Sequence, residues 1–101
     1  MTAPHPNDCP GDAADYFGDY TDGRYDPYAQ LQFIYTLSET HLSADGLAFF
    51  IGRPGADGIE FAYRAEHSGL WAFYPTEKRW MLVASDIATL EQDWLSGDLK
   101  V

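Results

Sequence analysis

Residues 59–84, IEFAYRAEHSGLWAFYPTEKRWMLVA, decide the fold of this chain. They hold three short apolar stretches, at 59–64, 70–74 and 80–84, separated by the turn-forming segments HSG and PTEK. The first stretch alternates apolar and polar side chains, as a half-buried strand does. The second is apolar on both faces, which is typical of a strand inside a sheet. Short strands joined by tight turns predict an antiparallel sheet.

A helix is expected directly after the last strand. Ser85 or Asp86 can accept hydrogen bonds from the free amides of its first turn, and Gly97 suits a left-handed stop. Its apolar side chains share one face: Ile87, Leu90 and Trp94. Residues 47–51 form a further apolar run before a glycine-rich turn. These patterns predict an α+β fold, a small antiparallel sheet with the C-terminal helix packed on one face and one further helix before the sheet.

Residues 28–42 fit two structures. Leu31, Phe33 and Tyr35 alternate as in a strand, whereas Leu31, Ile34 and Leu42 fit helical spacing. The length of the segment, and Pro27 at a possible first turn, favour a helix. We therefore predict the further helix here, with a strand as the alternative.

The length of 101 residues suits one domain. Residues 1–12 are rich in proline and polar side chains, which predicts a flexible N-terminal tail. Residues 13–101 then form a single α+β domain. Within it, residues 13–27 mix aspartates with aromatic rings, and we expect an irregular segment held on the core by those rings.

The net charge of −10 is the most unusual property of the chain. Residues 1–46 hold eight acidic residues and one arginine, a net of −7, and residues 47–101 hold eight acidic and five basic residues, a net of −3. Such a surface repels nucleic-acid phosphate and anionic lipid. It attracts a basic protein or serves only solubility, and the sequence leaves both interpretations open.

Catalytic and metal-binding patterns are weak. The three histidines lack neighbours at metal-ligand spacing, and Cys9 lies in the proline-rich tail without rigid support for a nucleophile. The aspartates between Asp15 and Asp26 do not match the spacing of a calcium loop. The glycines at 52–58 precede no lysine or helix of the kind that holds phosphate. We predict a non-enzymatic protein with no metal and no cofactor.

The aromatic residues allow two roles. Trp71, Trp80 and Trp94 fall on predicted core elements, so core packing is favoured over a ligand platform. The N-terminal tyrosines either form a binding surface or anchor their segment to the domain, and both interpretations stay open. These are Tyr16, Tyr20, Tyr25 and Tyr28.

The start of the chain has neither a basic region nor an apolar run typical of a signal peptide, and no segment approaches the ~20 apolar residues of a membrane span. One cysteine permits no internal disulfide, which suits a reducing compartment. We therefore expect a cytoplasmic protein. The oligomeric state stays open.

The second half of the chain carries a family resemblance in four segments: FIGRPGADGIEFAYR at 50–64, GLWAFYP at 69–75, LVASD at 82–86 and WLSG at 94–97. Over about residues 49–101 it resembles the SUKH superfamily, bacterial proteins similar to a yeast cell-wall synthesis regulator. The resemblance implies an α+β sheet domain without enzymatic activity. Many members look like immunity proteins, which block a toxin by binding it, and such toxins are often nucleases with basic clefts.

The resemblance and the charge together favour an immunity-type inhibitor that binds a basic toxin or effector protein, since opposite charge steers association. The expected contact residues are Asp15, Asp19, Tyr20, Asp22, Asp26, Asp57 and Glu60. The alternatives are a nucleic-acid mimic that occupies the site of a DNA-binding defence protein, and a small ligand-binding or regulatory domain.

Overall fold

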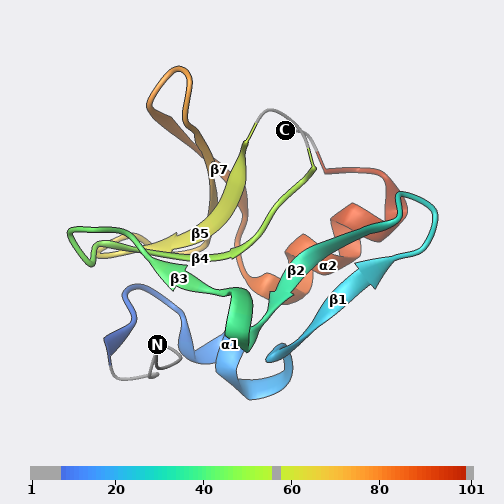
Figure 1. Cartoon of the computed structure of the whole chain (residues 1–101), viewed down its shortest axis with the longest axis horizontal. Coiled ribbons are helices and arrows are strands. Elements are labelled where there is room, and N and C mark those ends of the chain that lie inside the picture. Colours follow the sequence, from blue (N-terminus) through green and yellow to red (C-terminus); the bar gives the residue numbers. More distant parts are fainter. Residues whose placement is uncertain (1–7, 56–57, 100–101) are drawn as a thin grey trace.

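The computed structural model describes residues 8–55 and 58–99 and confirms the predicted α+β class. Seven antiparallel strands form one sheet, which two helices accompany (Figure 1). The elements are α1 (Ala14–Asp19), β1 (Asp22–Asp26), β2 (Leu31–Thr36), the 3-10 turn η2 (Leu37–Glu39), β3 (His41–Leu42), β4 (Ala48–Gly52), β5 (Glu60–Arg64), β6 (Leu70–Tyr74), β7 (Arg79–Ala84) and α2 (Ile87–Ser96).

The sheet runs in the order β1-β2-β4-β5-β6-β7, and β3 pairs with β4 beside β2. His41 of β3 pairs with Phe50 near the middle of β4, while Ile34 of β2 pairs with Gly52 at its end. A Cβ atom on Gly52 would collide with the carbonyl oxygen of Phe33. Glycine is therefore what allows β2 and β4 to approach at this point.

One face of the sheet carries the main core and both helices. Leu90 of α2 and Tyr16 of α1 are fully buried in it, as are the strand residues that alternate toward the same side. Trp94 of α2 stacks on Phe33 of β2 with 5.0 Å between the ring centroids. Figure 1 accordingly shows α2 running beside the β1–β2 hairpin.

Helix α2 begins and ends as predicted. Asp86 is its N-cap, and the side chain accepts a 2.8 Å hydrogen bond from the amide of Thr89. Gly97 ends the helix in the left-handed conformation, at a φ of 82°. The C-terminal helix on one sheet face is thus confirmed, together with the four strands that precede it in the sequence.

The prediction of a helix within residues 28–42 is wrong. This segment holds strand β2, the turn η2 and strand β3. Pro27 lies in the turn of a β1–β2 hairpin, where the Asp26 carboxylate accepts hydrogen bonds from the amides of Tyr28 and Ala29. Strand β2 pairs with β1 at one edge and with β4 at the other, and its residues Phe33, Ile34 and Tyr35 are all buried.

The helix before the sheet is α1, in a segment that we expected to be irregular. Residues 13–27 form α1 and β1, although the rings do hold them on the core: Tyr16 and Tyr20 are buried. Tyr25 and Tyr28, in contrast, are 57% and 98% exposed. Tyr16 and Tyr20 therefore anchor the segment as one of the two interpretations expected, and a binding role for exposed Tyr25 and Tyr28 stays a prediction.

Of the predicted tail, residues 1–7 lie outside the described residues. Cys9 packs against the core, and the Asp12 carboxylate accepts a 3.0 Å hydrogen bond from the amide of Gly69. Contacts with the sheet thus begin before residue 13. Within the described ranges, the structure has no helix long and apolar enough to cross a bilayer.

Candidate functional site

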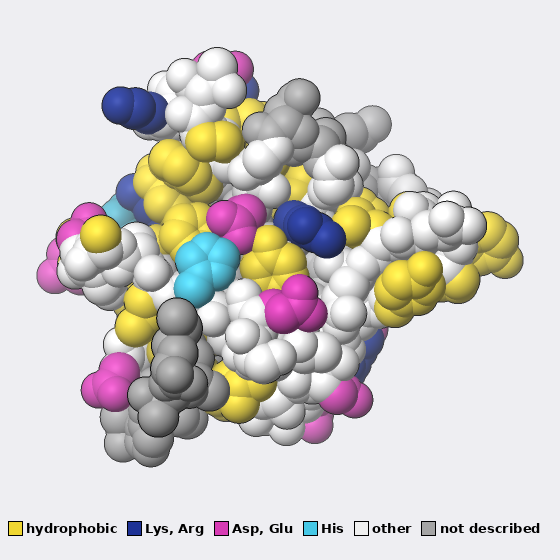
Figure 2. Space-filling model, viewed as in Figure 1, with side chains coloured by type: hydrophobic (Ala, Val, Ile, Leu, Met, Phe, Trp, Pro, Cys, Tyr) yellow, Lys and Arg dark blue, Asp and Glu magenta, His cyan; other side chains and the backbone are white. Residues whose placement is uncertain are grey.

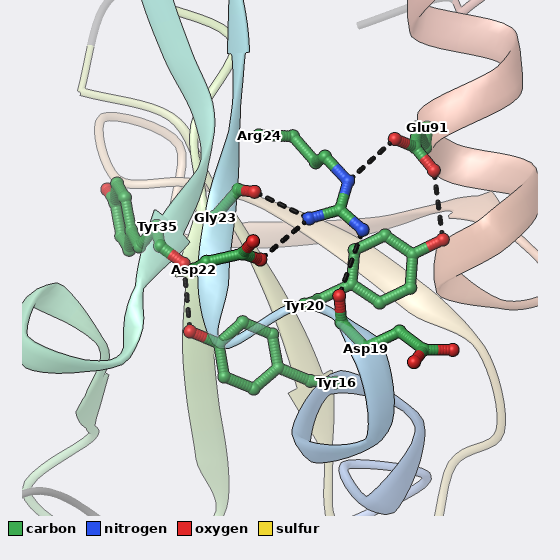
Figure 3. A network of polar contacts seen from close by, with 8 residues as sticks. All are labelled: Tyr16, Asp19, Tyr20, Asp22, Gly23, Arg24, Tyr35 and Glu91. Atoms are coloured by element: carbon green, nitrogen blue, oxygen red, sulfur yellow. Dashed lines mark hydrogen bonds and ion pairs between the residues drawn. The ribbon is translucent and has the colours of Figure 1, made fainter.

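Arg24, in the middle of β1, makes polar contacts with three parts of the chain (Figure 3). Its Nε lies 2.9 Å from a Glu91 oxygen on α2, and one terminal nitrogen lies 2.9 Å from Asp22. The other terminal nitrogen donates to the backbone oxygen of Asp19. The hydroxyl of Tyr20 donates to the second oxygen of Glu91, so this network fixes α1, β1 and α2 relative to one another.

Carboxylates gather on the outside of this network. Asp15 and Asp19, four residues apart on α1, line an open groove of about 310 Å³ together with Asp86 at the start of α2. Asp22 lies at the neighbouring end of β1. Among the described residues only Asp22 of these four forms an ion pair. We call Asp15, Asp19, Asp22 and Asp86 the acidic corner.

The other predicted contact residues do not join the acidic corner. Tyr20 is 8% exposed, so its ring offers little surface to a partner. Asp26 lies at the opposite end of β1, where the indole nitrogen of Trp94 donates to it. This hydrogen bond is the main cause that lowers the pKa of Asp26. Asp57 lies outside the described residues, and Glu60 belongs to a different face of the molecule.

Glu60 begins β5 on the sheet face opposite both helices. The hydroxyl of Tyr35 donates a 2.7 Å hydrogen bond to it, and the imidazole of His41 lies 3.5 Å from the same oxygen. Burial and Glu60 both raise the pKa of Tyr35 well above its usual range. The tyrosine therefore stays protonated and acts as a donor to the carboxylate.

This opposite face carries an aromatic surface that we call the open face. Within the described chain no helix covers it. Phe73 pairs with Trp80, and Trp71 pairs with Leu82, in the β6–β7 register, so these four side chains share the face. Figure 2 looks onto it and shows hydrophobic side chains from the base of the β6–β7 hairpin to a histidine, with acidic side chains beside it.

Trp71 is thus not a core residue as predicted, because it lies on the open face outside both buried clusters, whereas Trp80 packs on that face against a small second cluster of Ala48, Phe50 and Ala62. Trp94 alone packs in the main core. The signal in the sequence was the alternation within β6, where Trp71 and Phe73 point to one side and Leu70 and Ala72 to the other. The sequence did not reveal which side the helices would cover.

Two groups that could serve as nucleophiles, the Cys9 thiol and the Tyr20 hydroxyl, are held protonated. Burial and the nearby Asp8 raise the pKa of the Cys9 thiol to about 11. Burial, the hydrogen bond to Glu91 and its charge raise the pKa of Tyr20 to about 12. In residues 8–55 and 58–99 no three His, Cys, Asp or Glu side chains are placed to hold a metal ion.

Comparisons of the chain with protein-family models, with curated protein sequences and with solved structures find no match.

Proposed function

We propose that this chain is a non-enzymatic acidic binding protein, an immunity-type inhibitor that neutralises a basic toxin or effector protein in the cytoplasm by direct binding. The observation that carries the proposal is the excess of carboxylates without a counter-charge. Sixteen acidic residues face six basic ones. In the described part of the chain, arginine pairs only with Asp22, Glu77 and Glu91.

Unpaired carboxylates act through the field of the whole molecule. A surface of one sign raises the encounter rate with a partner of the opposite sign, and the effect weakens with salt. Asp15 and Asp19 are both exposed, and their helix is fixed to the domain by buried Tyr16 and by the Arg24 network. The charge at the acidic corner is therefore presented on a rigid support, which limits the entropy lost on binding.

The pattern resemblance to immunity proteins supports the same function.

Affinity capture tests the proposal. The purified protein is immobilised, exposed to a lysate of its source cells at low ionic strength, and the retained proteins are identified by mass spectrometry. We expect one basic protein whose toxic activity falls when the chain is added. A matched column carries the variant Asp15→Asn with Asp19→Asn and should retain less of it. Retention of no basic protein, or of one whose activity is unaffected, would refute the proposed function.

A further inference from the structure

The open face contains a hollow with an aromatic floor. Phe50, Phe73 and Trp80 line it, with ring centroids 4.8 Å apart for Phe73 and Trp80 and 6.2 Å apart for Phe50 and Trp80. The volume is about 610 Å³, and the wall includes Leu47, which is 57% exposed. This size is in the range of pockets that bury a small molecule or a large side chain.

The floor is accessible on a domain of only 101 residues that has a separate core on the other face. Within the floor Phe50 is buried next to Ala48 and Ala62, whereas Phe73 and Trp80 are only partly buried. Leaving such rings in contact with water forgoes roughly 25 cal/mol for each Å² of apolar surface. Apolar surface of this kind commonly marks a binding site.

The charges around the hollow indicate which partner it suits. Asp45 and Glu66 line it, and within the described ranges neither forms an ion pair. Asp45 is held by the Ser43 hydroxyl at 2.6 Å and the Leu47 amide at 2.9 Å. These hydrogen bonds lower its pKa, so the carboxylate stays charged at neutral pH.

Arg64 is the positive group in the hollow. Its guanidinium lies 4.8 Å from the ring centroid of Trp71 and 4.7 Å from that of Trp80, so it is held against the rings. It forms no ion pair with a described carboxylate, which leaves Asp45 and Glu66 available to an incoming cation. His67 also lines the hollow, with its ring edge against Trp71.

We propose that this hollow is the anchor site for the basic partner: it takes an aromatic side chain of that protein, and basic residues flanking the aromatic one face Asp45 and Glu66. The proposal rests on the proposed function and places the main contact on the open face. The acidic corner then contributes attraction at longer range. Binding energy in protein interfaces concentrates in buried tryptophan, tyrosine and arginine, and the open face presents two tryptophans and an arginine.

Uniformly 15N-labelled protein allows a direct test because its three indole N–H groups report separately. Trp71 and Trp80 lie on the open face, and Trp94 lies in the core with its indole bonded to Asp26. The probe is the acetylated, amidated tripeptide Arg-Trp-Arg, with Arg-Ala-Arg and Glu-Trp-Glu as controls. We expect saturable shifts of the Trp71 and Trp80 indoles with Arg-Trp-Arg, smaller shifts with either control, and no shift of Trp94.

The variant Asp45→Asn with Glu66→Gln keeps the aromatic floor and the turn hydrogen bonds to an oxygen at position 45. It should weaken binding of Arg-Trp-Arg by about fivefold, which corresponds to the loss of one or two exposed charge contacts. Trp80→Ala should abolish the shift of the Trp71 indole. Shifts that centre on Asp15 and Asp19, or equal shifts with Glu-Trp-Glu, would overturn the assignment of the hollow.

The basic protein found by affinity capture allows the anchor site and the proposed function to be tested separately. If that protein binds the Asp45→Asn, Glu66→Gln variant and the Trp80→Ala variant as tightly as the unchanged chain, the anchor site is wrong while the function stands. If Arg-Trp-Arg binds as described but no basic protein is captured, the hollow is supported and the proposed function fails.

Discussion

Tyr20 and Glu91 are 71 residues apart in the sequence and share a hydrogen bond of 2.9 Å that joins the end of α1 to the outer side of α2. Glu91 also pairs with Arg24, so one carboxylate connects two elements of the N-terminal half to the C-terminal helix. The positions of α1 and β1 relative to α2 therefore depend on this one carboxylate.

Removing the Tyr20 hydroxyl should destabilise the domain. We expect Tyr20→Phe to lower the free energy of unfolding by about 1.5 kcal/mol, because a hydrogen bond to a charged acceptor is lost while Glu91 stays partly buried. Urea unfolding followed by circular dichroism measures the change, with Tyr25→Phe at an exposed position as the control. A double-mutant cycle with Glu91→Gln should show coupling between the two positions. Additive effects on the free energy of unfolding would contradict a stabilising Tyr20–Glu91 hydrogen bond.

Two of the buried tyrosines, Tyr16 and Tyr63, should respond differently to loss of the hydroxyl. The Tyr16 hydroxyl donates 2.8 Å to the backbone oxygen of Tyr35, so Tyr16→Phe should cost about 1 kcal/mol. The Tyr63 hydroxyl is buried and finds no hydrogen-bond partner in the described chain. Tyr63→Phe should therefore leave stability unchanged or raise it by up to about 1 kcal/mol. Urea unfolding measures both changes. A large loss of stability for Tyr63→Phe would be inconsistent with an unpaired hydroxyl.

Because the Asp86 carboxylate caps α2, the free energy of unfolding should fall in acid. The hydrogen bond from Thr89 lowers the pKa of Asp86 below its ordinary value of 3.8. A carboxyl whose pKa is lower in the folded state contributes stability above its unfolded pKa and loses it as the pH falls through the folded pKa. Asp86→Ala should cost about 1 kcal/mol at neutral pH.

Asp86→Asn separates the charge from the cap, because asparagine still accepts the hydrogen bond. We expect it to keep most of the stability at neutral pH and to show a smaller loss between neutral pH and pH values below 3.8. Unfolding curves at several pH values measure this. An Asp86→Asn protein with an unchanged pH dependence would show that other carboxylates account for the acid sensitivity.

Charge reversal at the acidic corner should act mainly on the rate of association. With the captured basic protein, Asp15→Lys together with Asp19→Lys should slow association by about tenfold at low salt and change dissociation little, because both side chains are exposed and act at long range. Surface plasmon resonance gives both rates. An effect confined to dissociation would instead place these residues inside the contact.

The part of the fold from β4 to α2 was predictable because each of its elements carries a local signal. Leu70 to Tyr74 is apolar throughout and lies between two other strands, and Asp86 and Gly97 mark the ends of the helix. The β1–β2 hairpin was missed because its stability depends on distant groups, such as Trp94 stacked on Phe33. A local signal existed in Asp26 before Pro27, a combination that favours a turn.

The candidate site was predicted only in part for a related reason. Asp15, Asp19 and Asp22 lie close in sequence, and a short helix followed by a strand keeps them together. Glu60 lies elsewhere because the face of a strand residue depends on register, which no charge count reveals. The open face that carries Trp71 and Trp80 was not predictable, because a sequence shows that a strand has two apolar faces but not which one a helix will cover.

The salt dependence of the affinity for the captured basic protein tests the central claim most directly. Isothermal titration calorimetry would give Kd from about 0.05 M to about 0.3 M salt, a range over which screening of exposed charges increases strongly. The account predicts that Kd rises by about tenfold or more and that the rise is smaller for Asp15→Asn with Asp19→Asn. A Kd that does not change with salt, or that changes equally for the variant, would contradict recognition through the acidic surface.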